Sequence, residues 1–181
     1  VQQNTGNSKI DAYLQRDVTY RATVDARTGA LEARVEVVLR NEVPSTDLPR
    51  VVVGNGRGLP NGTSASTVTV FTPHQVTAAS IDGRPLVLAR SEEAGLGAWD
   101  LPLVAVPPGG AATIVLELAG GVDLARGYRF RYLPQPVANP DRLDATVEVR
   151  GGRFTSAGPG RRLSFDGSAE EPRELSSQVR R

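Results

Sequence analysis

The sequence has 181 residues, of which 21 are basic and 20 acidic, so its formal net charge is only +1. A charge so close to zero excludes the strong overall field with which basic proteins attract nucleic acids or anionic membranes. The absence of cysteine excludes disulfides, thiolate metal sites and cysteine nucleophiles, and no apolar run approaches the roughly 20 residues that span a bilayer. We therefore expect one large or two small domains, without nucleic acid as a partner and without direct membrane insertion.

The N-terminal residues predict a linker followed by a short helix. Residues 1–7 are mostly polar, which is typical of a linker, and because the chain opens with Val1 we expect a fragment of a longer protein. In residues 8–16, Ser8 can cap a helix with Asp11 as its reciprocal partner, and the apolar residues share one face. Because so short a helix is not stable by itself, we expect it to cover one end of the sheets.

Residues 17–41 predict two long strands joined by a tight turn. Apolar and polar residues alternate on both sides of residues 26–29, and Gly29 can adopt the positive φ that the reversal requires. Alternation over this length places one apolar face against a core and one charged face in water. The inward positions are Val18, Tyr20, Ala22 and Val24 before the turn and Leu31, Ala33, Val35, Val37 and Leu39 after it.

The rest of the chain repeats this alternation in shorter segments. Asp82 and Gly83 form the strongest two-residue hairpin signal, whereas the proline-rich residues 134–140 predict a crossover. The last thirty residues predict three modest strands around turns at 158–160 and 170–172, and the alternative is a partly disordered tail. The other expected strands lie at residues 50–54, 66–72, 75–81, 84–90, 99–103, 112–118, 128–132 and 143–150.

Short strands at regular spacing are typical of a sandwich or a barrel, and we expect a sandwich. The predicted fold is all-β: an antiparallel, immunoglobulin-like β-sandwich of about ten to twelve strands with one short N-terminal helix. Residues 8–150 would form this domain. Residues 151–181 would add a C-terminal β extension, either within the same domain or as a second small sheet. If there are two sandwiches, the boundary is expected near Gly120 and Gly121.

No catalytic or metal-binding motif is complete. The glycine-rich residues 54–62 lack both the Gly-Lys-Ser/Thr and the helix of a phosphate-binding loop. His74, the only histidine, lies in a turn, and no nucleophile-elbow serine completes a hydrolytic triad. Asp141 and Asp144, with Asn139 nearby, come nearest to a calcium site but lack EF-hand spacing. We expect no metal, no cofactor and no catalytic residue.

Glycoside hydrolysis needs two carboxylates about 5 to 9 Å apart in a cleft. The acidic residues form no pattern that would predict such a pair; the candidates are Glu92, Glu93, Glu117, Glu170 and Glu171. On the strand after the first turn, Glu32 and Glu36 alternate with Arg34 and Arg40, which indicates cross-strand charge pairing on a solvent face.

Residues 128–132 alternate three aromatic residues with Arg129 and Arg131. Burying arginines costs more than burying aromatic rings, so we expect the rings to face the core and the arginines to face solvent. The two arginines are then candidates for an anion-binding patch, and Trp99 is a candidate for stacking on a sugar ring. These three residues are the predicted ligand-binding candidates.

Turn and packing motifs extend over most of the chain. They are NSKIDAYLQR at residues 7–16, VTY at 18–20, LRN at 39–41, GLPNGT at 58–63, FTP at 71–73, DGRP at 82–85, VPPGG at 106–110 and QPVANPDRL at 135–143. Together they resemble the C-terminal region of an actinobacterial family of membrane-anchored proteins known only as a domain of unknown function. The resemblance implies an extracytoplasmic domain at the cell surface, anchored through a part of the protein outside this chain, and it implies no activity.

Three functional hypotheses follow. The first is a non-catalytic module of the cell envelope that binds a protein or acts as a spacer. The second is a module that binds cell-wall glycan, which would need an exposed Trp99 or exposed tyrosines along a shallow groove. The third is a hydrolase with an unrecognised site, which would need a cleft with carboxylates of perturbed pKa.

Overall fold

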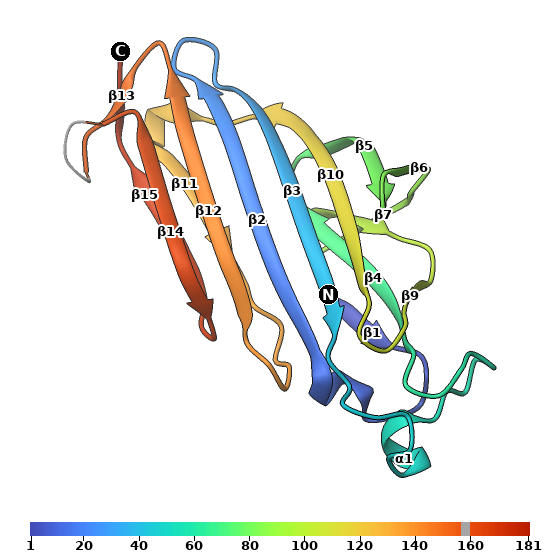
Figure 1. Cartoon of the computed structure of the whole chain (residues 1–181). Coiled ribbons are helices and arrows are strands. Elements are labelled where there is room, and N and C mark those ends of the chain that lie inside the picture. The colour runs from blue at the N-terminus through green and yellow to red at the C-terminus, as the bar shows by residue number, and fades with distance from the viewer. Residues whose placement is uncertain (157–159) are drawn as a thin grey trace.

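The computed structural model describes residues 1–156 and 160–181 and shows an all-β protein with two layers of strands (Figure 1). The larger layer is a seven-stranded sheet. From one edge to the other its strands are β14 (Arg162–Ala169), β12 (Asp141–Arg150), β2 (Leu14–Asp25), β3 (Ala30–Asn41), β10 (Ala111–Gly121), β5 (Gln75–Ile81) and β6 (Arg84–Leu86).

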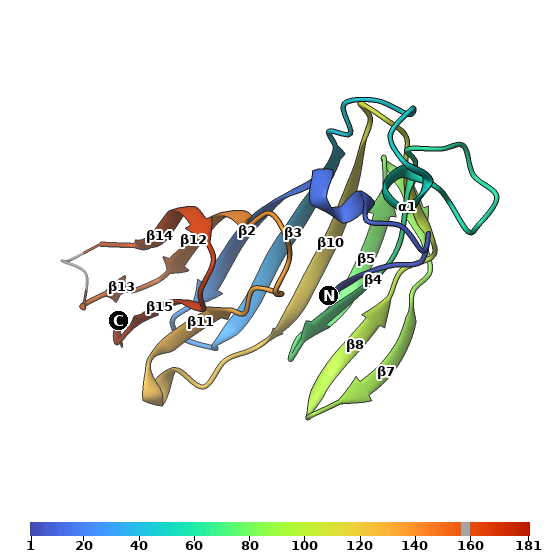
Figure 2. The same ribbon diagram turned by 90° about the horizontal axis from the view of Figure 1, so that it is seen from below.

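The opposite layer is divided into three smaller sheets, which cover two halves of the same face of the large sheet (Figure 2). On one side β4 is central and pairs with β1, β8 and β9, while β7 pairs with β8. On the other side β11 pairs with β15, and β13 pairs with β16. Their bounds are β1 (Gln2–Asn4), β4 (Ser64–Thr72), β7 (Ala89–Glu93), β8 (Leu96–Asp100), β9 (Val104–Val106), β11 (Tyr128–Tyr132), β13 (Arg153–Phe154), β15 (Arg173–Ser177) and β16 (Val179–Arg180).

The long hairpin predicted at residues 17–41 is confirmed as β2 and β3. The two strands pair in register from Leu14 with Asn41 to Val24 with Leu31. Gly29 has a φ of 74° and donates its N–H to the carbonyl of Asp25 at 2.8 Å. The Asp25 carboxylate accepts the N–H groups of the turn that follows it, and these hydrogen bonds lower its pKa. The alternation and the turn glycine were therefore sufficient to predict this part of the fold.

The fold is all-β and sandwich-like, as predicted, but its pairing is not wholly antiparallel. β12 runs parallel to β2, in register from Arg142 beside Asp17 to Arg150 beside Asp25. A parallel pair needs a long connection between its strands. Here the chain between them includes all strands from β3 to β11 and the proline-rich residues 134–140, which form the crossover that the sequence predicted. The described residues contain sixteen strands rather than ten to twelve, because several have only two or three residues.

The predicted N-terminal helix is much shorter than residues 8–16. Only Ile10–Tyr13 are helical, as the 3-10 helix η1, and β2 begins at Leu14. Ser8 makes no capping hydrogen bond, and the position before the helix is Lys9. The other described helices are α1 (Arg50–Val53) and η2 (Leu124–Arg126). None of the described helices is long and apolar enough to cross a membrane.

Two further segments differ from the prediction. Within the predicted linker at residues 1–7, Gln2–Asn4 form β1, which pairs with β4 and buries Gln2. The predicted strand at residues 50–54 is α1 instead, with Val51 exposed and Val53 buried in a small apolar cluster with Ile10 and Val43. Three consecutive valines have no alternation that could distinguish a short strand from one helical turn.

One hydrophobic core joins both halves of the chain. Strands before and after Gly120 belong to the same seven-stranded sheet, and Phe154 and Leu163 of the C-terminal segment are buried in the same core as Val24 and Leu116. The described part of residues 151–181 therefore belongs to the sandwich. The turn predicted at residues 158–160 lies largely outside the described residues.

The hairpin turns provide a matched pair of substitutions. Gly29 and Gly83 have nearly the same positive φ, but a Cβ on Gly29 would collide with the carbonyl oxygen of Val122, whereas a Cβ on Gly83 would meet nothing within 4 Å. Gly83→Ala should cost about 1 kcal/mol from backbone strain alone, and Gly29→Ala at least about 1 kcal/mol more. Urea unfolding measures both; equal losses would contradict this account.

Candidate functional site

The outer face of the seven-stranded sheet carries a network of ion pairs between neighbouring strands. At its centre, Arg34 of β3 donates to Glu117 of β10 at 2.6 Å and to Glu36 at 3.4 Å. The hydrogen bond from Arg34 to Glu117 raises the pKa of the guanidinium. Alternation along β3 and β10 points these charges away from the core, as predicted for residues 32–40.

The network continues across the sheet from this centre toward β14. Each further pair joins two adjacent strands, so the charges are fixed in rows by the strand register. Each exposed pair contributes little to stability, but the set holds the side chains in defined positions. The pairs are Arg40 with Asp17, Arg21 with Asp144, Arg142 with Asp166, and Arg162 with Glu148.

The same face is hollowed across the strands. A hollow of about 750 Å³ lies over β5, β10, β3, β2, β12 and β14, and a second one of about 410 Å³ adjoins it toward the ends of β12 and β14. The two share Thr23, Glu148 and Arg162 in their walls. We call the larger hollow the outer trough; its main polar residues are Arg21, Thr23, Glu32, Arg34, Thr77, Glu117, Thr146, Glu148 and Arg162.

The side chains of the outer trough are better suited to binding a ligand than to catalysing a reaction. Of its three carboxylates, Glu117 and Glu148 are held by arginines at 2.6 Å. A glycosidase pair needs one carboxyl group kept protonated by its surroundings, which an adjacent arginine opposes. In residues 1–156 and 160–181, no group of three histidine, cysteine or acidic residues could hold a metal ion. The walls present guanidinium, carboxylate and hydroxyl groups to whatever lies in the trough.

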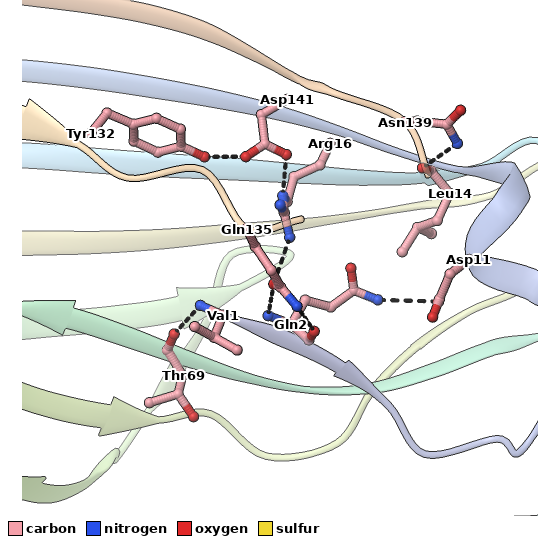
Figure 3. Close-up of polar contacts among 10 residues, drawn as sticks. All are labelled: Val1, Gln2, Asp11, Leu14, Arg16, Thr69, Tyr132, Gln135, Asn139 and Asp141. Atoms are coloured by element: carbon pink, nitrogen blue, oxygen red, sulfur yellow. Dashed lines mark hydrogen bonds and ion pairs between the residues drawn. The ribbon is translucent and has the colours of Figure 1, made fainter. Parts of the chain in front are cut away.

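A second polar cluster lies inside the molecule, where β1, β2 and the proline-rich crossover meet (Figure 3). Asp141 at the start of β12 has a fully buried side chain, and its two oxygens accept hydrogen bonds from Arg16 at 2.5 Å and from the hydroxyl of Tyr132. Burial and the neighbouring Asp141 raise the pKa of Tyr132. The carboxylate is therefore paired at both oxygens.

Gln135 extends this cluster to β1. Its side-chain oxygen accepts a hydrogen bond from the backbone N–H of Gln2, and its side-chain nitrogen donates one to the carbonyl of Gln2, both at 2.7 Å (Figure 3). The amide thus makes the pair of backbone hydrogen bonds that a residue of a neighbouring strand would make. Asn139 donates to the carbonyls of Ala12 and Leu14 at 3.0 Å. These contacts hold the crossover against the N-terminal strand, so the cluster has a structural explanation.

The predicted ligand-binding residues do not form one site. Arg129 and Arg131 are exposed on β11, as expected, but Glu174 lies directly opposite Arg131 and is 3.5 Å from the Arg129 guanidinium. Trp99 is only 6% exposed and is covered by the Arg90 guanidinium, 5.6 Å from the ring centre. It therefore does not present the flat exposed ring that sugar stacking requires.

The aromatic side chains of β11 face the core, in agreement with the cost of burying its arginines. Tyr128 is buried, and Phe130 stacks on Tyr20 with ring centres 4.3 Å apart. Burial raises the pKa of both Tyr20 and Tyr128. No sugar platform forms on this strand.

The other candidates from the sequence are also dispersed. Asp141 is buried with Arg16, Asp144 is paired with Arg21 on the outer face, and the Asn139 amide is bonded to backbone carbonyls, so these three do not converge on a cation. Glu92 and Glu93 lie on the exposed strand β7, and Glu170 and Glu171 follow β14. Of these candidates, only Glu117 is among the residues that line the trough.

Sequence reasoning identified the solvent face of β3 but not the trough. The residues that complete it, such as Arg21, Thr77, Thr146 and Arg162, come from strands far apart in the sequence. Alternation shows which side chains share a face of one strand. It does not show which strands are neighbours in the sheet. No sequence pattern indicated that β12 pairs in parallel with β2.

Comparisons with known proteins bear on the fold alone. No protein-family profile and no curated protein matches the sequence. A Legionella pneumophila protein, named as a candidate nutrient-binding protein, matches with a TM-score of 0.51 at 10% identity, over 97% of this chain and 69% of that one. The M1 zinc metallopeptidase of Deinococcus radiodurans matches with a TM-score of 0.42 at 17% identity, over 89% of this chain and 39% of that one, which is too weak for an argument. The resemblance to the actinobacterial family stays a prediction.

The buried cluster and the outer face provide a matched test of two ion pairs. Asp141→Asn leaves the largely buried Arg16 without its counter-charge, so we expect a loss of about 3 kcal/mol or more in the free energy of unfolding. Asp144→Asn removes a pair whose two side chains are more than 40% exposed and should cost less than about 1 kcal/mol. Chemical denaturation measures both, and a similar cost for the two variants would contradict the structural role of Asp141.

His74 gives a pH-dependent prediction. The half-buried imidazole of His74 packs against Gly120, and burial lowers its pKa below the ordinary value of 6.5. Below that pH the unfolded chain binds more protons than the native protein, so stability should fall as the pH decreases from about 7 to about 5. We expect His74→Gln to flatten this part of the stability curve. An NMR titration giving His74 a pKa of 6.5 or higher would contradict the prediction.

Proposed function

We propose that this protein is a non-catalytic interaction module that docks a protein partner along the outer trough. The observation that carries the proposal is the combination of a hollow of about 750 Å³ with charged walls held in place by ion pairs. Prearranged charges favour a complementary polar surface because few side chains need to be ordered on binding. Both signs of charge alternate along the trough, which suits a mixed protein surface better than a simple ion.

The alternative of glycan binding by aromatic stacking receives less support. The residues that line the trough include no aromatic side chain, and Trp99 is buried beneath Arg90. Stacking on an exposed ring is the usual means by which a shallow protein surface holds a neutral sugar. A protein partner is therefore our preferred occupant of the trough.

We further infer an extracytoplasmic location at the cell surface, with the anchor in a part of the protein outside this chain. The support is the resemblance of the motifs at residues 7–16, 58–63 and 135–143 to the actinobacterial membrane-anchored family. An envelope protein would be the partner in this setting. If no partner is found, the module would be a spacer.

The proposal is tested by pull-down from an actinobacterial envelope extract with three forms of the domain. The trough variant is Arg21→Glu with Arg34→Glu, and the control is Arg57→Glu with Arg84→Glu, which makes the same charge change at exposed sites outside the trough. We expect a protein captured by the wild type and the control to be reduced at least about tenfold with the trough variant, since repulsive charges would replace matched ones.

Circular dichroism should show that all three forms are folded. Undiminished capture by the trough variant would exclude the trough as the docking surface. Equal loss with the control would show that capture depends only on net charge. If the wild type captures nothing, the spacer hypothesis replaces the interaction module.

A further inference from the structure

One end of the sandwich gathers arginines from four separate segments. The β2–β3 turn contributes Arg27, and η2 contributes Arg126. The ends of β12 and β14 and the β13–β16 pair contribute the others. The set, which we call the basic end, is Arg27, Arg126, Arg150, Arg153, Arg161, Arg162, Arg180 and Arg181, and all eight are exposed.

Hydrogen bonds and strand pairing show that these segments are adjacent; η2 is joined through the Gln178 amide, which donates to the carbonyl of Arg126 at 3.5 Å. Ala26 donates its N–H to the carbonyl of Arg150 at 2.9 Å, and Val149 donates to the carbonyl of Arg161 at 2.9 Å. Arg153 pairs with Arg180 across β13 and β16. The Arg181 guanidinium donates to the carbonyl of Ala26 at 3.1 Å, beside Arg27. In Figure 1 this is the end at which the β2–β3 turn, the tip of β12 and the C-terminus meet.

The charge at this end is strongly unbalanced. Eight of the 21 basic side chains lie here with only four of the 20 acidic ones, Asp25, Glu32, Asp123 and Glu148. Thirteen basic and sixteen acidic side chains remain for the rest of the chain. In the part of the chain that the structure describes, only Arg162 of the eight forms an ion pair, with Glu148. A net charge of +1 thus conceals an end with an excess of four positive charges.

A hollow lies within this charged end. The hollow of about 410 Å³ is walled by Thr23, Glu148, Val149, Arg150, Gly151, Arg161 and Arg162. The guanidinium group is well suited to oxyanions because its planar donors match carboxylate and phosphate oxygens. The other five arginines of the basic end do not line this hollow, so a single small anion within it would leave them unmatched. The complementary ligand is one that repeats its negative charge.

The surroundings of the arginines narrow the class of polyanion. The large hydrophobic side chains that are exposed in the described residues, Val1, Val51, Val87, Leu103, Leu133 and Val137, all lie outside these segments. Membrane attachment by a basic patch and protein interfaces both draw on apolar contacts, which this end does not offer. Its aromatic residues Tyr128 and Phe154 are buried, so no platform for nucleic-acid bases is exposed there. A hydrophilic polyanion fits best.

We propose that the basic end binds an acidic glycan, a polysaccharide that carries carboxylate or phosphate groups at repeated positions. The glycan lies across the β2–β3 turn and the ends of β12 and β14, with one of its anionic groups in the hollow. This surface does not rest on the proposed docking in the outer trough. Arg150 and Arg161 line the hollow of the basic end but not the trough.

The test uses a quadruple variant, Arg27→Gln, Arg150→Gln, Arg161→Gln and Arg180→Gln. No side-chain hydrogen bond or ion pair of these four is found in residues 1–156 and 160–181, so the fold should be preserved. The matched control, Arg50→Gln, Arg57→Gln, Arg84→Gln and Arg131→Gln, removes the same charge from exposed positions elsewhere. Thermal unfolding should give similar midpoints for the two variants.

Binding is measured at 50 mM and 200 mM salt with polygalacturonate as the carboxylate glycan, phosphorylated dextran as the phosphate glycan, and unmodified dextran as the neutral glycan. Duplex DNA, polyglutamate and phosphatidylglycerol vesicles represent the other polyanions. We expect the wild type and the control to bind at least one acidic glycan, with affinity falling as salt rises, and the quadruple variant to bind at least about 30-fold more weakly at low salt. The preferred acidic glycan identifies the charged group.

Three results would overturn the proposal. One is binding to neither acidic glycan, or equal binding to neutral dextran. Another is an equal loss of binding in the quadruple variant and the control, which would mean that location is irrelevant. The third is tighter binding to DNA, polyglutamate or vesicles than to either acidic glycan, which would assign the basic end to a nucleic acid, an acidic protein or a membrane.

Discussion

The rest of the structure depends on the pairing of Asp141. A carboxylate with no solvent access is very costly unless both of its oxygens find charged or hydrogen-bonding partners. Arg16 and Tyr132 supply them, and each comes from a different part of the chain. The interaction places the start of β12 beside β2, which sets the one parallel pairing in the large sheet. Gln135 then fixes β1 in the opposite layer, so one buried charge connects the two layers.

The position of β12 determines the outer surface. Because β12 lies between β2 and β14, Asp144 reaches Arg21 on one side and Glu148 reaches Arg162 on the other. The trough crosses these strands, and its polar walls exist only in this strand order. The same placement brings Arg150 beside the β2–β3 turn and thereby gathers the basic end. The position of β12 thus determines both the strand order of the large sheet and the arrangement of charges on its surface.

The sequence predicted what is local. Alternation identified the hairpin of β2 and β3, the buried faces of β10 and β12, and the inward aromatics of β11, and Asp82-Gly83 marked a real turn. It failed where distant contacts override local pattern. Residues 1–7 look like a linker, yet Gln2 is buried because Gln135 and Ser66 satisfy its polar groups. Ser8 and Asp11 suggest a capped helix, yet β2 requires an extended chain from Leu14 onward.

The candidate surfaces were harder to predict than the fold for a related reason. Net charge is a sum over the whole chain, and a sum of +1 excludes a strong field only if the charges are evenly spread. Here they are not, because Arg27, Arg150 and Arg180 are far apart in sequence but lie at the same end of the sandwich. Composition argues against a basic protein as a whole, while topology creates a basic surface. For an all-β protein, in which neighbouring strands come from distant segments, charge has to be counted by position in the sheet.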